Sequence, residues 1–174
     1  LAIELEIYNN LIQFAATHLK SILRNAATIA RIDCLQSFAR IARERKYVRP
    51  TVDDSTIIDI KQGRHPVIET LMKVGEKYIP NDVMLDTESQ QIMMITGPNM
   101  SGKSALLRQT ALIVLMAQMG SFVPAKAARI GVVDKIFTRV GASDDLSMGQ
   151  STFMVEMMEV ANILKEATNN SLVI

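Results

Sequence analysis

One short segment limits the possible folds more than any other feature of the sequence. Residues 97–104 read Gly-Pro-Asn-Met-Ser-Gly-Lys-Ser and satisfy the pattern G-x-x-x-x-G-K-[ST] in full. Its glycines let backbone N–H groups point at phosphate oxygens, and the helix that follows directs the positive end of its dipole at the same anion. The required context is present, because an apolar run at residues 92–95 precedes the loop and a helical pattern at residues 103–119 follows it, closed by Gly120. The sequence therefore predicts an α/β domain built around a phosphate-binding loop.

The side chains of this loop, a Walker A segment or P-loop, have expected roles in nucleotide binding. We expect Lys103 to reach the β- and γ-phosphates of ATP or ADP, and Ser104 to hold Mg²⁺ through its hydroxyl. The alternative is a glycine-rich turn that binds no nucleotide. On the first interpretation, the residues that hold the phosphates are Gly97, Pro98, Asn99, Met100, Ser101, Gly102, Lys103 and Ser104.

The first 49 residues contain neither Gly nor Pro, which is typical of helices. Between Leu19 and Ile41, apolar residues recur at steps of three and four, and the arginines fall largely outside this stripe. We interpret this pattern as a packed helix with a solvated basic face. Residues 1–49 therefore form a helical segment, and residues 50–174 form a second region of different character.

The second region alternates short apolar runs with turn residues and helical patterns. This alternation favours a mainly parallel sheet with flanking helices. A helix is predicted from Ser151 to about Ala167, in addition to the one after the loop. The predicted strands are residues 56–60, 78–85, 91–96, 134–140 and 172–174.

Composition excludes several classes of protein. Lys plus Arg minus Asp plus Glu is 19 − 18 = +1, which argues against a nucleic-acid or membrane binder that acts through net charge alone. Cys34 is the single cysteine, so the chain has no internal disulfide and no cysteine cluster for zinc, in keeping with a reducing cytoplasm. No apolar run reaches the length of a membrane span.

A second segment, Leu-Ser-Met-Gly-Gln at residues 146–150, leads directly into the helix predicted from Ser151. One interpretation is that Ser151 only caps this helix through its hydroxyl. The other is a likeness to the Leu-Ser-Gly-Gly-Gln signature of ABC-type ATPases, with Met148 in place of a glycine, in which the helix caps a γ-phosphate held by another subunit. His65, held extended before Pro66, is predicted to be structural.

Several motifs in order make a more specific resemblance. Residues 63–67, 78–81, 96–104, 137–145 and 151–157 together resemble the MutS family of DNA mismatch repair proteins. The resemblance covers nearly the whole chain. In it, residues 1–49 correspond to the end of the core and lever helices, and residues 50–174 correspond to the first part of an ABC-type ATPase domain.

The resemblance implies roles for individual residues. Asn99 would contact the γ-phosphate or the attacking water, and with Lys103 would be catalytic. Tyr78, where the family usually shows Phe, would stack on adenine, and Ile79 would pack near the base; the alternative for Tyr78 is a core aromatic on a strand. Ser151 would act in trans, on nucleotide held by the partner subunit.

The resemblance also implies a function and partners. It predicts a homodimeric, DNA-dependent ATPase of the bacterial cytoplasm and nucleoid. That ATPase would bind mismatched double-stranded DNA through parts outside this chain and would act with a MutL-type repair partner, without a membrane. The Walker B acids are expected just after Ile174, where the chain stops. Whether this chain turns over ATP or is an inactive, truncated nucleotide-binding module therefore stays open, with another ABC-type ATPase as a further alternative.

Overall fold

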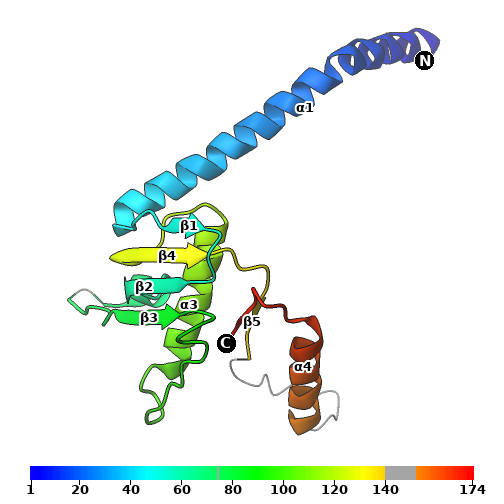
Figure 1. Cartoon of the computed structure of the whole chain (residues 1–174). Helices are drawn as coiled ribbons and strands as arrows, with labels where there is room; N and C mark the ends of the chain where they lie inside the picture. The colour runs from blue at the N-terminus through cyan, green and yellow to red at the C-terminus, as the bar shows by residue number, and fades with distance from the viewer. Residues whose placement is uncertain (74, 140–151) are drawn as a thin grey trace. The chain divides into compact units, whose positions relative to one another are not determined.

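The computed structural model describes residues 1–73, 75–139 and 152–174, which form two compact units, Leu1–Ile41 and Ala42–Ile174. Figure 1 shows the elements along the chain. In order they are α1 (Ala2–Arg45), β1 (Thr51–Asp53), β2 (Ile58–Gly63), α2 (Ile68–Leu71), β3 (Asn81–Leu85), α3 (Lys103–Gln118), β4 (Ala127–Gly131), β5 (Ile136–Phe137), α4 (Thr152–Glu166) and β6 (Leu172–Val173).

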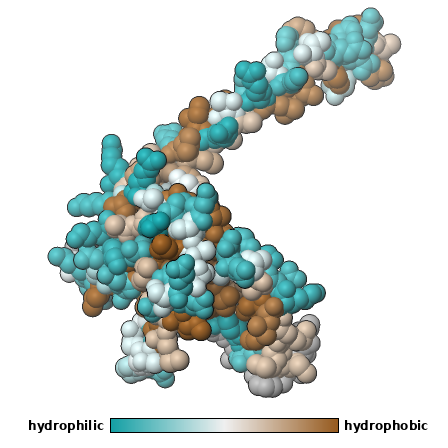
Figure 2. Space-filling view, in the orientation of Figure 1, coloured by the Kyte–Doolittle hydropathy of each residue, from teal (hydrophilic) through white to brown (hydrophobic). Residues whose placement is uncertain are grey.

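The opening helix is confirmed as α1, and it ends where the backbone requires. Lys46 has a φ of 53°, in the left-handed region, and the Tyr47 N–H donates to the Ala42 carbonyl at 2.9 Å. This is the closing hydrogen bond of a Schellman motif, which satisfies a carbonyl at the helix end. The predicted packing of the apolar stripe is not observed, because the side chains from Leu19 to Ile41 are almost all exposed. Figure 2 shows hydrophobic and hydrophilic groups alternating along this helix.

The larger sheet has four strands in the order β1-β4-β2-β3. β4 runs parallel to β1 but antiparallel to β2, and β3 runs antiparallel to β2. The prediction of a mainly parallel sheet is therefore wrong for these strands. Parallel neighbours need a long crossover, usually helical, and α2, the only helix assigned between β2 and β3 in the described residues, has just four residues.

A second, two-stranded sheet agrees with the prediction. β5 and β6 pair in parallel, with Ile136 opposite Leu172, and α4 lies between them in sequence. The strand predicted at residues 91–96 is not assigned. Met93 and Ile95 are half-buried while Ile92 and Met94 are exposed, which is the alternation of an extended chain, but no ladder of hydrogen bonds accompanies it.

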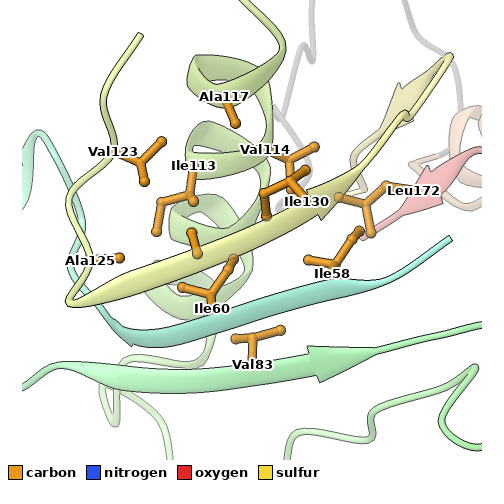
Figure 3. Packing of buried hydrophobic residues seen from close by; sticks show 11 residues of the cluster. Ile58, Ile60, Val83, Ile113, Val114, Ala117, Val123, Ala125, Ile130 and Leu172 are labelled. Atoms are coloured by element: carbon orange, nitrogen blue, oxygen red, sulfur yellow. The ribbon is translucent and has the colours of Figure 1, made fainter. Parts of the chain in front are cut away.

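The core of the second unit lies between α3 and the four-stranded sheet (Figure 3). α3 contributes Ile113, Val114 and Ala117, and the sheet contributes Ile60 and Ile130, all of which are buried. Gly120, with a φ of 82°, ends α3 as predicted: its N–H donates to the Ala117 carbonyl, and the Ser121 N–H donates to the Met116 carbonyl. This packing fixes α3, and with it the loop at its amino end.

Candidate functional site

The loop at residues 97–104 lies between an irregular segment and the first turn of α3. Three of its residues have positive φ: Gly97 (152°), Met100 (64°) and Gly102 (92°). At Gly97 a Cβ would approach the Ser101 Oγ to 2.9 Å, so glycine also provides the space for the turn. The loop is exposed apart from Lys103, which is half-buried. These residues therefore form an exposed turn at the amino end of α3.

Lys103 folds back over this turn. Its Nζ donates to the Gly97 carbonyl at 2.6 Å and to the Pro98 carbonyl at 2.7 Å. These oxygens are uncharged, so the positive charge of the side chain is solvated but not neutralised by the contact. The ammonium is thus held at the mouth of the loop by partners that an anionic ligand could replace.

The amino end of α3 supports an anion at the same place. Its N-cap is Gly102, no side chain caps the helix, and the first turn contains no acidic residue. The first N–H groups of a helix have no partner within it, so here they remain for a ligand or solvent. The Lys103 ammonium and these amides are groups that suit a phosphate-like anion.

The structure brings the predicted loop residues together in one turn, including Asn99 and Ser104, whose side chains are exposed. Ser104 lies in the first turn of α3, next to Lys103. Within residues 1–73, 75–139 and 152–174, no group of three or more His, Cys, Asp or Glu side chains could hold a metal ion. The Ser104 hydroxyl is a hard oxygen ligand of the kind that suits Mg²⁺. Such an ion would also be coordinated by phosphate oxygens.

Tyr78 and Ile79 lie outside the strands, just before β3. Ile79 is 81% exposed, whereas Tyr78 is half-buried and its hydroxyl donates to the Gln109 Oε1 at 2.9 Å. Burial, followed by the nearby Glu69, raises the pKa of Tyr78, so the phenol stays protonated and can donate. The alternative of a core aromatic on a strand does not describe this residue, because β3 begins at Asn81.

The sequence did not single out Gln109, although α3 presents it to Tyr78. It is fully buried, one helical turn before Ile113 on the face that packs against the sheet. The available signal was a polar residue at an apolar position of the predicted helix, because a buried amide normally has a hydrogen-bond partner.

Polar contacts beside α2 complete this part of the unit. His65 is 6% exposed, and its Nδ1 accepts from the Val67 and Ile68 N–H groups at 3.2 and 3.3 Å. Burial, then Arg108, lowers the pKa of His65, which keeps the accepting nitrogen unprotonated. The structural role predicted for His65 agrees with these bonds.

Ser151 and the segment 146–150 fall outside the described residues. The helix predicted after them is confirmed as α4. Arg139, at the end of the described chain before this gap, pairs with Glu156 at 2.6 Å and Glu159 at 2.9 Å, both on α4. These ion pairs join the segment after β5 to the helix.

Comparison with known proteins shows which family the chain resembles. Residues 93–174 match the family model of MutS domain V. The chain is 64% identical over all 174 residues to the DNA mismatch repair protein MutS of Phocaeicola vulgatus, and 62% identical over the same length to that of Bacteroides thetaiotaomicron. It is 62% identical over 172 residues to that of Flavobacterium johnsoniae. In each case the match covers 20% of the relative, so the chain spans about a fifth of the length of these relatives.

Among the described parts of the chain, no helix is both long and apolar enough to cross a membrane.

Proposed function

The chain belongs to the MutS family of DNA mismatch repair proteins, and from this premise we propose that residues 50–174 form the nucleotide-binding part of a DNA mismatch-repair ATPase. The observation that carries the proposal is Lys103, held over the turn by the Gly97 and Pro98 carbonyls at the uncapped amino end of α3. The loop lies within residues 93–174, which match the family model of MutS domain V, and this match supports assigning the anion site to that domain.

Phosphate binding would exchange the uncharged hydrogen-bond partners of Lys103 for charged ones. A phosphate oxygen would replace the two carbonyls on Lys103, forming a charge-assisted hydrogen bond that is roughly twice as strong as a neutral one. The amides of the first turn of α3 would bind the same anion. Asn99, exposed in the turn, would contact the γ-phosphate or the attacking water. Mg²⁺ held by Ser104 would supply charge neutralisation between the phosphates.

The base of the nucleotide would lie at Tyr78 and Ile79. Tyr78 offers an aromatic ring in a partly open position, and Ile79 offers an exposed apolar side chain beside it. Flat aromatic rings stack well on other aromatic rings, so these two residues suit a purine base such as adenine. The site would therefore take ATP or ADP.

In the complete protein we place this site in a homodimer. Ser151 would act in trans on nucleotide held by the partner subunit, so that each of two composite sites needs both protomers. Residues 1–49 would be the end of the core and lever helices that join the ATPase to the part that binds mismatched double-stranded DNA. Nucleotide and DNA binding would then alter each other's equilibrium by linkage, in a protein of the bacterial cytoplasm and nucleoid that acts with a MutL-type repair partner.

The test is substitution of the loop lysine in the complete gene product. Lys103→Ala should abolish measurable binding of Mg²⁺–ATP and, with it, ATP hydrolysis. Lys126→Ala is the matched control, because Lys126 is an exposed lysine of the same unit that lies outside the loop, and it should leave binding unchanged. Equal affinity for ATP in the Lys103→Ala variant and the unaltered protein would refute the assignment.

A further inference from the structure

Gln109 has a polar side chain where the surrounding packing is apolar. It is fully buried on α3, on the face that also presents Ile113, and its Oε1 accepts the Tyr78 hydroxyl hydrogen at 2.9 Å. Its Nε2 is buried and has no hydrogen-bond partner in the described structure. Burying an amide costs free energy, and an unpaired donor adds to that cost. The bond to Tyr78 is the contact that offsets it.

The place of this amide is fixed by close packing. Gly63, the last residue of β2, faces Gln109 so closely that a Cβ there would lie 2.7 Å from the Gln109 Nε2 and 3.1 Å from the Ile113 Cδ1. The absence of a side chain at Gly63 therefore lets α3 approach the end of β2 with Gln109 between them. The acceptor for Tyr78 is thus carried by a rigid helix and confined by a neighbouring strand.

Tyr78 itself has no such support from regular structure. It belongs to the irregular segment before β3, next to the exposed Ile79. A side chain in such a segment loses rotamer freedom when it is held in one position, and a hydrogen bond at the far end of the ring fixes that position before any ligand arrives. The hydroxyl therefore provides an anchor at the far end of the ring.

The helix that anchors Tyr78 is the helix that begins at the loop. Gln109 follows Lys103 by six residues, which at the rise of an α-helix is about 9 Å along the axis. One rigid element therefore carries the phosphate-binding lysine at its start and the anchor of the aromatic ring less than two turns later. The separation between the two ends of the candidate site is set within a single helix.

We propose that Gln109 is a positioning residue that holds the Tyr78 ring, through its hydroxyl, in the orientation that stacks on the base of a nucleotide bound at residues 97–104. The inference rests on the proposed function and deepens it, because it names what orients the base-recognising ring. The anchor depends on the Tyr78 hydroxyl, which a phenylalanine at this position would not provide.

The test compares a ligand that has a base with one that lacks it. In the complete gene product, affinities are measured for Mg²⁺–ATP and for Mg²⁺–tripolyphosphate in Tyr78→Phe, Gln109→Met and the double variant. Loss of one neutral hydrogen bond should weaken ATP binding about two- to tenfold in each single variant and leave tripolyphosphate binding unchanged. The double variant should be no weaker than the single ones, because both remove the same bond.

Matched controls separate positioning from general damage. Tyr8→Phe removes the hydroxyl of an exposed tyrosine of α1, and Thr110→Val removes a buried hydroxyl of α3 that donates only within its own helix, to the Leu106 carbonyl at 2.9 Å. Both should keep the unaltered ratio of the two affinities. Tyr78→Phe deletes a single oxygen and keeps the ring, so it gives a result even where Gln109→Met does not fold.

Three results would overturn the inference: an unchanged ATP affinity in Tyr78→Phe, an equal loss for both ligands, or additive losses in the double variant. Failure of the proposed function looks different. In that case the unaltered protein binds neither ligand, or Lys103→Ala binds both as well as the unaltered protein does, and the inference falls together with it.

Discussion

His65 shows how one buried side chain organises the backbone beside the candidate site. Its Nδ1 accepts two N–H groups at the start of α2, and those groups would otherwise have no partner within that short helix. Both bonds need the nitrogen without its proton. Since burial and Arg108 lower the pKa of His65 below its ordinary value of 6.5, the folded state keeps the neutral ring where the unfolded chain would take up a proton.

This difference predicts how stability depends on pH. A histidine whose folded pKa is lowered contributes its stability above the unfolded value and loses it as the pH falls, because the unfolded state then binds more protons. The free energy of unfolding should therefore decrease as the pH drops below 6.5. His65→Asn keeps a side-chain acceptor that does not titrate. Between pH 7.5 and 5.5, the free energy of unfolding measured with urea should therefore fall less in this variant than in the unaltered protein. Parallel pH profiles for both proteins would contradict the prediction.

At the scale of single residues, the sequence predicted most where backbone geometry alone decides. Gly102 and Gly120 both have the positive φ expected for a loop and a helix end. Gln109 was missed because its role depends on a partner 31 positions away, Tyr78. The local pattern shows only a polar residue at an apolar position of the helix, and it does not show which residue is its hydrogen-bond partner.

At the scale of elements, Arg64 joins three segments of the second unit. Its Nε donates to the Glu69 Oε2 on α2 at 2.7 Å, and its Nη2 donates to the Arg45 carbonyl at the end of α1 at 3.2 Å. The Arg64 and Glu69 side chains are only 25% and 14% exposed. Burial, then Glu69, raises the pKa of Tyr47 to about 12, so Tyr47 stays protonated beside this pair. The ion pair thus holds α2 to the end of β2, and the bond to the Arg45 carbonyl adds the last turn of α1.

Removing the charge of Glu69 should therefore destabilise the second unit. Glu69→Gln keeps the size of the side chain but weakens a partly buried, charge-assisted bond, and it should lower the free energy of unfolding by about 1.5–3 kcal/mol. Lys135–Glu166 provides the matched comparison, since those side chains are 42% and 46% exposed. Glu166→Gln should cost less than about 1 kcal/mol, because solvent screens exposed pairs. Equal losses in urea unfolding would show that burial does not set the strength of the Arg64 pair.

The elements themselves were predictable to the extent that each carries a local pattern. α1, α3 and α4 follow from periodicity and breakers, and the parallel pair β5–β6 follows from the helix between its strands. β1 and β4 are short, and their residues show no marked apolar run, so nothing local announced them. The direction of β2 against β3 and β4 depends on long-range pairing, which periodicity does not encode.

At the scale of the whole molecule, the family was predictable because its motifs recur in order along nearly the entire chain, and the relatives confirm it. The composite site is a separate matter. Lys103 lies in the described turn, whereas Ser151, proposed to act in trans, lies outside the described residues. If the site is shared, Lys103 and Ser151 of each site come from two different protomers, so a single chain cannot form a complete site.

Mixing two defective proteins tests whether Ser151 acts on the site of the partner subunit. Lys103→Ala and Ser151→Ala variants should each hydrolyse ATP poorly. In a mixed dimer, however, the intact Lys103 of one protomer meets the intact Ser151 of the other, so one of the two composite sites is restored. Random pairing of equal amounts makes half of the dimers mixed, each with one working site, and the mixture should recover about a quarter of the unaltered ATPase rate. If Ser151 served only to cap α4 of its own chain, mixing would restore nothing, because every site would keep a defect.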